Sequence, residues 1–398
     1  MSILGNNFLG MDFDNPFFLT PSPLTADSEK VIEAFRIGWG GVVMQTIGES
    51  PPPNSTPREK IIRSGRTKWG VVDHASVSRL SLDQYTQEID KIRNEFPDRP
   101  LITSIFGGDD IERWQEIADK LEPHKLSAIE IDTGLHSFAS EGTGLSELGQ
   151  DLEGLGKVVS AVRESTTLPV IVKLSPNVTD IVMFARTARE AGADGFTATS
   201  GLLGVGGIDP ETLLPMPSGN VEHPVSRYHG AGLRPVALRW TANLAKELTA
   251  PIFGCGGVAV WQDAAEFLSV GASAVQVGSA AEWNGIQIID ELNSGLEGYL
   301  ERRSFNSVKD VVGKALPNIV EFSDLDLDIQ MVATIDESRC TGCNVCVRAC
   351  ADGGFQAIHM EDKIAHIDVM KCDGCGLCIY VCPPDIVQLV PKDAHQLR

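Results

Sequence analysis

The 398-residue sequence has no run of about 18 apolar residues, and no basic segment followed by an apolar one near its start. The first absence argues against a membrane-spanning helix, and the second argues against a signal peptide. Basic residues are also few, because 33 Lys and Arg stand against 54 Asp and Glu, for a formal net charge of −21. Nucleic-acid binding requires basic patches, so the charge argues against a nucleic-acid partner.

Cysteine is nearly absent outside one C-terminal stretch. The exception is Cys255, which lies in an apolar segment and is expected to be a small buried residue. A secreted disulfide scaffold would use its cysteines differently, so this usage predicts a reducing, cytoplasmic location.

No GxGxxG fingerprint of a dinucleotide-binding fold is present. The nearest glycine cluster, Gly204-Val205-Gly206-Gly207, follows no suitable strand–helix unit. We therefore expect any nicotinamide site to lie on another protein.

The C-terminal stretch carries a doubled cysteine motif. Its ligand candidates are Cys340, Cys343, Cys346, Cys350, Cys372, Cys375, Cys378 and Cys382, the last followed by Pro383. This spacing is typical of two [4Fe–4S] clusters, in which the fourth cysteine of each run ligates the other cluster. We assign Cys382 to the first run's cluster and Cys350 to the second run's cluster. Paired zinc sites or disulfides are the alternatives, and zinc motifs use two separated cysteine pairs instead.

The preceding residues alternate short β-branched runs with amphipathic stretches. The eight expected strands are Phe17–Ser22, Gly41–Thr46, Leu101–Phe106, Ala128–Thr133, Val170–Ser175, Gly195–Ser200, Ile252–Gly257 and Ala274–Ser279. The expected helices include Ser28–Ile37, Leu82–Glu95, Ile111–Leu121, Leu152–Glu164, Val178–Ala191, Pro235–Leu248 and Trp261–Val270. Eight βα units predict an α/β fold, a (β/α)8 TIM barrel with its catalytic loops at the carboxyl ends of the strands. A doubly wound open sheet is the rival fold.

The length suits about two domains. We expect a barrel over residues 1–310, a linker over 311–335 and a ferredoxin-like domain over 336–398. Three long connections, Ile47–Ser81, Gly134–Asp151 and Gly201–Gly232, are candidate lids or pocket walls.

Glycines end the last two expected strands, in Gly256-Gly257-Val258 and in Gly278-Ser279. Loops at these positions of a barrel commonly bind phosphate, because glycine lets backbone N–H groups approach the anion. Simple tight turning is the other interpretation.

The chain resembles the dihydropyrimidine dehydrogenase family, in particular the FMN and iron–sulfur subunit of the bacterial NAD-dependent enzymes. Matching stretches are NPFFLTPSP (15–23), GWGGVV (38–43), LPVIVKLSPNVTDI (168–181), AGADG (191–195), RPVALR (234–239), WQDAAEFLSVGA (261–272), both glycine turns and both cysteine runs. The resemblance implies an FMN-binding barrel of the dihydroorotate/dihydropyrimidine dehydrogenase type, fused to a bacterial-type 2[4Fe–4S] ferredoxin domain. By this likeness, FMN would contact Thr20, Ser22, Gln45, Thr46, Lys173, Gly230, Gly256, Gly257, Val258, Gly278 and Ser279.

The substrate positions depart from the family pattern. The family's proton-donating cysteine corresponds to Leu135, which has no proton to give. Its pyrimidine-binding Asn and Glu become Asp73 and Ala75, and its Asn-Thr pair becomes Ser200-Gly201. Asp132 and Gln45 replace further family residues, and Gln45 removes a positive charge expected beside the flavin. A site built for hydrogen bonds rejects a mismatch strongly, so uracil and thymine are not the expected substrates.

The loop after Leu135 offers other proton donors, namely His136, Ser137 and Glu141. His136 titrates in the right range, although it could equally be a solvated loop histidine. If Asp73 and Asp132 both face the pocket, they suit a donor-rich or cationic substrate, or one keeps the other protonated. Asp132 could instead orient the loop.

The sequence therefore predicts an oxidoreductase subunit that acts on a C=C or C–N bond of a small cyclic or unsaturated compound. Two [4Fe–4S] clusters would relay electrons to or from an FAD- and NAD(P)-binding partner subunit or a ferredoxin, in an oligomer. The alternatives are an electron-transfer subunit without substrate chemistry, and a dihydropyrimidine dehydrogenase with a non-cysteine acid.

Overall fold

The computed structural model describes residues 2–48, 57–73, 77–135, 148–216 and 226–395. The chain divides into two compact units, Met1–Asn318 and Ile319–Arg398. The first part of the expected linker therefore belongs to the first unit, because the backbone N–H groups of Gly313 and Ala315 donate to the carbonyls of Leu268 and Ser269. Each unit is described by itself below.

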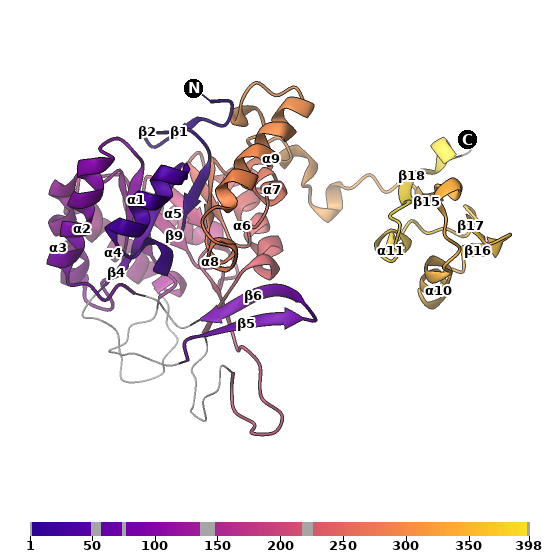
Figure 1. The fold of residues 1–398 in the computed structure, drawn as a ribbon, viewed down its shortest axis with the longest axis horizontal. Coiled ribbons are helices and arrows are strands. Elements are labelled where there is room, and N and C mark those ends of the chain that lie inside the picture. Colours follow the sequence, from indigo (N-terminus) through magenta and orange to yellow (C-terminus); the bar gives the residue numbers. More distant parts are fainter. Residues whose placement is uncertain (1, 49–56, 74–76, 136–147, 217–225, 396–398) are drawn as a thin grey trace. The chain divides into compact units, whose positions relative to one another are not determined.

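The first unit is a closed barrel of eight parallel strands (Figure 1). The barrel strands are β3 (Phe17–Leu19), β4 (Gly41–Ile47), β7 (Leu101–Ile105), β8 (Ala128–Asp132), β9 (Val170–Leu174), β10 (Gly195–Ala198), β13 (Ile252–Cys255) and β14 (Ala274–Val277). They pair in chain order, and β14 returns to pair with β3. The predicted (β/α)8 barrel is confirmed, and the rival open sheet is wrong because every strand has two neighbours.

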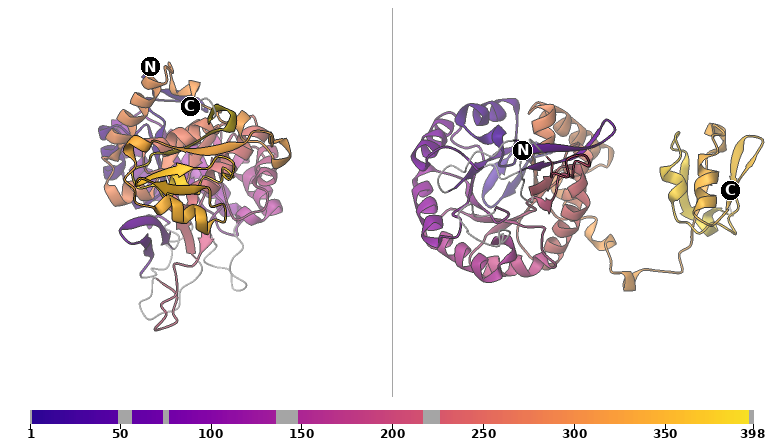
Figure 2. Two further views of the ribbon diagram at one scale, coloured as in Figure 1. Left: turned by 90° about the vertical axis from the view of Figure 1, so that its right-hand side faces the viewer. Right: turned by 90° about the horizontal axis from the view of Figure 1, so that it is seen from below.

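Helices surround the strands as a ring, seen in the right-hand view of Figure 2. They are α1 (Ser28–Ile37), α2 (Leu82–Glu95), α3 (Ile111–Leu121), α4 (Leu152–Glu164), α5 (Ile181–Glu190), α6 (Arg234–Glu247), α7 (Trp261–Ser269), α8 (Ser279–Asn284) and α9 (Ile288–Arg302). Side chains cap the N-termini of several helices, because Asp27, Ser81 and Asp110 accept hydrogen bonds from first-turn N–H groups. These caps explain why the predicted starts of α1, α2 and α3 match the structure.

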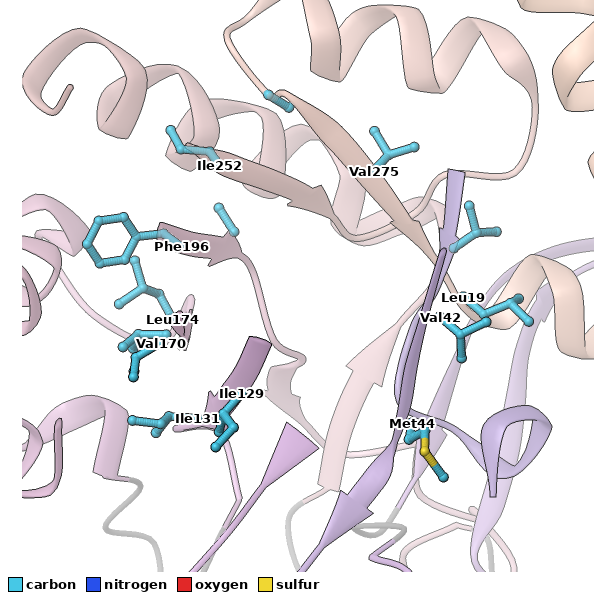
Figure 3. Close-up of a cluster of buried hydrophobic side chains, with 14 of the residues drawn as sticks. Leu19, Val42, Met44, Ile129, Ile131, Val170, Leu174, Phe196, Ile252 and Val275 are labelled. Carbon is cyan, nitrogen blue, oxygen red and sulfur yellow. The ribbon is translucent and has the colours of Figure 1, made fainter. Parts of the chain in front are cut away.

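The main core lies between the strands and this ring of helices. Outward-facing strand residues such as Leu19, Met44 and Ile131 join helix residues such as Phe35 and Trp114 in one buried cluster. Figure 3 shows strand residues of this cluster at close range. Because side chains alternate across a strand, the intervening residues face the barrel interior.

The N-terminal end of the barrel interior is filled by aromatic rings. A hairpin of β1 (Asn6–Phe8) and β2 (Met11–Phe13) contributes Phe8 and Phe13, which join Phe18 and Phe253 in a second buried cluster. The ring centroids of Phe8 and Phe253 are 4.4 Å apart, and those of Phe18 and Phe253 are 4.9 Å apart. We call this group the aromatic plug.

Two of the long connections pair with each other instead of remaining irregular. β5 (Glu59–Ser64) and β6 (Thr67–Asp73) form a hairpin, and β11 (Leu202–Gly204) and β12 (Ser226–His229) extend it into a four-stranded antiparallel sheet of order β11-β12-β6-β5. We call it the roof sheet. Its strands were not predicted, since their charged residues resemble those of a solvated loop.

The second unit contains two antiparallel strand pairs and two short helices. These elements are β15 (Met331–Ile335), β16 (Ile358–Glu361), β17 (Ile364–Ile367), β18 (Val387–Pro391), α10 (Val345–Asp352) and α11 (Leu377–Tyr380), followed by the single turn α12 (Lys392–His395). A small apolar core, which includes Ala333, Ile358 and Val387, packs among the cysteines. Over the described part of the chain, no helix has the length and apolar character needed to cross a membrane.

Candidate active site and cluster-binding module

A cavity of about 430 Å³ opens at the carboxyl ends of the barrel strands. The predicted residues that line it are Thr20, Ser22, Thr46, Asp73, Asp132, Leu135, Lys173, Ser200, Gly201, Gly230, Gly256, Gly257, Val258, Gly278 and Ser279. Gln45 does not line it; its backbone carbonyl accepts a hydrogen bond of 2.7 Å from the Tyr85 hydroxyl. His136, Ser137, Glu141 and Ala75 lie outside the described residues.

The cavity floor is a polar network inside the barrel. The Lys173 ammonium contacts Glu130 Oε1 at 3.2 Å and Gln276 Oε1 at 2.9 Å. It also contacts Thr20 Oγ1 at 3.2 Å, while Glu130 Oε2 accepts hydrogen bonds of 2.6 Å from Thr197 and Gln276. Glu130, Lys173 and Gln276 come from inward positions of three strands, directly above the apolar residues Ala128, Ile171 and Ala274.

Lys173 keeps its charge although it is almost fully buried. Burial would lower the pKa of Lys173, but the surrounding acidic groups, Glu130 foremost and Asp132 among the others, together outweigh it, and the pKa is raised. A fixed positive charge on the floor favours a ligand that becomes negative there. The sequence indicated Lys173 but not its partner Glu130, because pairing them requires the strand register.

Cys255 also reaches the cavity wall, and it is buried as expected. Burial raises the pKa of the Cys255 thiol, and the nearby Lys173 charge only partly opposes this effect. The side chain is therefore a neutral thiol at neutral pH.

Glycines form one end of the cavity, where no side chain would fit. A Cβ on Gly278 would lie 2.6 Å from Thr20 Cγ2, and a Cβ on Gly257 would lie 2.8 Å from the carbonyl oxygen of Gly230. Gly256 and Gly257 have φ angles of +127° and +85°, in the left-handed region that favours glycine. Three backbone segments thus approach one another around a space suited to a phosphate at the start of α8, and these residues fit FMN.

The roof sheet supplies a charged wall that the sequence did not indicate. Arg227 pairs across the sheet with Asp73, and its guanidinium lies 3.8 Å from Asp73 Oδ1 and 4.0 Å from Asp132 Oδ2. His229, two residues further along β12, places Nε2 3.3 Å from Asp73 Oδ1. The sequence signal for this wall was the spacing of Arg227 and His229 just before Gly230, because residues two apart lie on the same face of a strand.

Both aspartates face the cavity, and Arg227 lies between them. The guanidinium is a positive charge close to both carboxylates. Asp132 also orients the following turn, since its Oδ1 accepts a 3.0 Å hydrogen bond from the Gly134 N–H. Asp132 therefore both lines the cavity and orients the turn that follows its strand.

Glu282, on α8 at the cavity edge, is a second group that the sequence did not indicate. Desolvation raises its pKa, and the negative charges of Glu59 and Asp73 add to the effect, so that the pKa reaches about 7. Its side chain is nevertheless exposed, so solvent screens much of this interaction.

Replacing Glu282 by glutamine should therefore change how stability depends on pH. The raised pKa means that the native state is favoured while Glu282 is protonated, and that this contribution is lost as pH rises through about 7. We expect Glu282→Gln to be more stable than the unmodified protein at pH 8 by up to about 1 kcal/mol, with the difference vanishing near pH 5. Thermal unfolding at both pH values measures this, with Glu297→Gln on α9 as the control; equal differences at both pH values would contradict it.

The second unit brings the eight C-terminal cysteines into two groups. Cys340, Cys343, Cys346 and Cys382 surround one small hollow, and Cys350, Cys372, Cys375 and Cys378 surround another. Backbone N–H groups approach two of the sulfurs, from Ala357 to Cys350 at 3.3 Å and from Ala333 to Cys372 at 3.4 Å. Four cysteines around each hollow fit a [4Fe–4S] cluster. Both N–H contacts belong to the group that contains Cys350 and Cys372, where they would tune the potential of that cluster.

Comparison with known proteins matches both units. Residues 3–300 match the family model "Dihydroorotate dehydrogenase", and residues 333–389 match "4Fe-4S dicluster domain". The chain is 33% identical over 364 residues to the NAD-dependent dihydropyrimidine dehydrogenase subunit PreA of Escherichia coli K12, covering 90% of this chain and 88% of that protein. It is 37% identical over 306 residues to the catalytic subunit of dihydroorotate dehydrogenase B (NAD(+)) of Pyrococcus furiosus, covering 77% and 96% respectively.

Fold and site together define a flavin-dependent oxidoreductase with a two-cluster iron–sulfur module. Its cofactors are FMN and two [4Fe–4S] clusters, as the family and the cysteine groups imply. The chain belongs to the dihydroorotate dehydrogenase family and is a divergent member of it. The expected resemblance to dihydropyrimidine dehydrogenase is confirmed.

Proposed function

We propose that this chain is the FMN- and iron–sulfur-containing subunit of an oxidoreductase that acts on a C=C or C–N bond of a small cyclic or unsaturated compound other than uracil or thymine. One observation carries the proposal. The glycine segments suited to a phosphate, the buried Lys173 and both groups of four cysteines are complete. By contrast, Leu135, Ser200 and Gly201 line the barrel cavity without the family's acid and amide groups.

When bound, FMN exchanges a hydride with an organic substrate, and the clusters carry single electrons. The protein residues have separate tasks around it. Lys173 holds a fixed positive charge at the floor, and the glycine segments leave room for the phosphate. Arg227, Asp73 and Asp132 offer a donor and two acceptors that orient polar groups of the substrate. Leu135 is 3% exposed and excludes water from its side of the cavity.

The proposal includes a partner. This chain has no GxGxxG fingerprint, so electrons would pass through the clusters to or from an FAD- and NAD(P)-binding subunit or a ferredoxin, within an oligomer. The names of the PreA and dihydroorotate dehydrogenase B relatives, which describe subunits of NAD-dependent enzymes, support this arrangement. A cytoplasmic location is also proposed, since none of the nine cysteines forms a disulfide.

The test uses anaerobically purified protein with its FMN and clusters, reduced by light and mixed with cyclic enones, imides and heterocycles. We expect at least one compound to reoxidise the flavin, and we expect uracil and thymine to do so at least about 10²-fold more slowly, because the groups that would recognise a pyrimidine are missing. Leu135→Cys should not restore uracil reduction, because Asp73, Ser200 and Gly201 still lack the pyrimidine contacts.

Two results would contradict the proposal. Rapid uracil reduction by the unmodified protein would restore the pyrimidine assignment. Failure of every compound would favour an electron-transfer subunit without substrate chemistry, the alternative that Leu135 supports.

A further inference from the structure

A two-electron reduction of a C=C bond requires a proton as well as a hydride. Among the described groups of the cavity, burial raises the pKa of the Cys255 thiol and makes it a weaker acid, and Glu282 lies on the exposed edge. Leu135 has no exchangeable proton. The Lys173 ammonium is held by Thr20, Glu130 and Gln276, and a guanidinium such as that of Arg227 does not give up its proton in proteins. An imidazole titrates near neutrality and is the best suited side chain for this task.

His229 is the histidine on the cavity wall. Its side chain is 27% exposed, so it is reachable from the cavity without being fully solvated. Asp73 Oδ1 lies 3.3 Å from its Nε2, so the carboxylate is close enough to influence how the ring is oriented. The same oxygen lies 3.8 Å from Arg227, which faces Asp73 across the roof sheet.

Gly201 lies directly against this imidazole. A Cβ at position 201 would lie 2.5 Å from His229 Cε1 and 2.8 Å from His229 Nε2. The same Cβ would lie 2.8 Å from Arg227 Cβ, so glycine at position 201 leaves room for β12 and for the His229 ring in this orientation. The loss of a substrate-binding side chain at position 201 is therefore also what makes room for the imidazole.

We propose that His229, oriented by Asp73, is the proton donor of this site in place of the missing acid at Leu135; this rests on the proposed function. In the reducing direction, bound FMN would supply the hydride to one carbon of the C=C bond, and the His229 imidazolium would give its proton to the adjacent carbon, where the former π pair forms the new C–H bond. The two electrons that reduce the substrate would come from the cofactor, and His229 would be left as neutral imidazole until solvent reprotonates it. In the oxidising direction His229 accepts the same proton.

His229→Gln tests this in the holoprotein, with the compound that reoxidises the unmodified protein. We expect the reoxidation rate to fall about 10²–10⁴-fold, with KM changed little and with FMN and iron contents unchanged. In His229→Ala, added free imidazole should restore part of the rate, which a purely structural role would not allow. The control is His124→Gln, which removes a surface pair in which His124 Nδ1 lies 2.6 Å from Asp90 Oδ1 and which should leave the rate unchanged.

A second measurement needs no substrate. NMR of histidine-labelled protein should show one imidazole signal that disappears in His229→Gln and shifts in Asp73→Asn, while His124→Gln leaves it in place. Full activity of His229→Gln, or a His229 signal unmoved by Asp73→Asn, would overturn the proposal. If no compound reoxidises the unmodified protein, the proposed function fails and this role fails with it, a result distinct from failure in the variant alone.

Discussion

Lys173→Met is expected to lower the free energy of unfolding by about 3–5 kcal/mol, because it leaves the Glu130 carboxylate buried without its cation. Glu130 is fully buried, and its remaining partners, Thr197 and Gln276, are neutral donors. The same change removes the positive charge from the cavity floor, so FMN should be retained less well. Urea unfolding and the flavin content of the purified protein measure the two effects.

The control for this prediction is Lys157→Met. Lys157 also pairs with a glutamate, at 2.6 Å from Glu153, but on the exposed face of α4. Exposed pairs of this spacing contribute about 0.3–0.5 kcal/mol, so this variant should be nearly as stable as the unmodified protein. The double variant Lys173→Met/Glu130→Gln should recover part of the loss, since no buried charge remains. Equal stability of Lys173→Met and Lys157→Met would show that the buried pair does not have the assigned role.

Cys382→Ala is expected to abolish the cluster of the first cysteine run while sparing that of the second run, although Cys382 belongs to the second run. The reason is the grouping in the second unit, where Cys382 shares a hollow with Cys340, Cys343 and Cys346. Iron should fall from about eight to about four atoms per chain, with the FMN content unchanged. Iron and flavin analysis after anaerobic purification measures both quantities.

The decisive comparison is between variants of cysteines that share a hollow but come from different runs. Cys382→Ala should give the same low-temperature electron paramagnetic resonance spectrum as Cys340→Ala, and Cys350→Ala should match Cys372→Ala. If Cys382→Ala matched Cys372→Ala instead, each run would hold its own cluster. Loss of FMN in these variants would show that the two units do not fold separately.

The barrel could be predicted because its signals are local. Each strand is a short buried run, each helix is amphipathic, and capping residues such as Asp27 and Ser81 mark the helix starts. The roof sheet could not be predicted, because β6 and β12 are about 150 residues apart and their pairing depends on the closed barrel.

The same reason limited prediction of the site. Residues on the strand ends, such as Thr20 and Lys173, were predicted because the family resemblance points to them and a barrel places its strand ends at the cavity. Arg227 and His229 were missed because their position depends on a sheet formed by two distant connections. Glu130 was missed because its role depends on the register between β8 and β9.

The aromatic plug has a kinetic consequence. Because Phe8, Phe13, Phe18 and Phe253 fill the N-terminal end of the barrel, the described interior is a well with its mouth at the roof sheet. Substrate and product must then use the same entrance and exclude each other from it. Product should accordingly be a competitive inhibitor toward substrate. Diffusion through this single entrance, rather than passage along the barrel axis, should limit how fast the site is refilled.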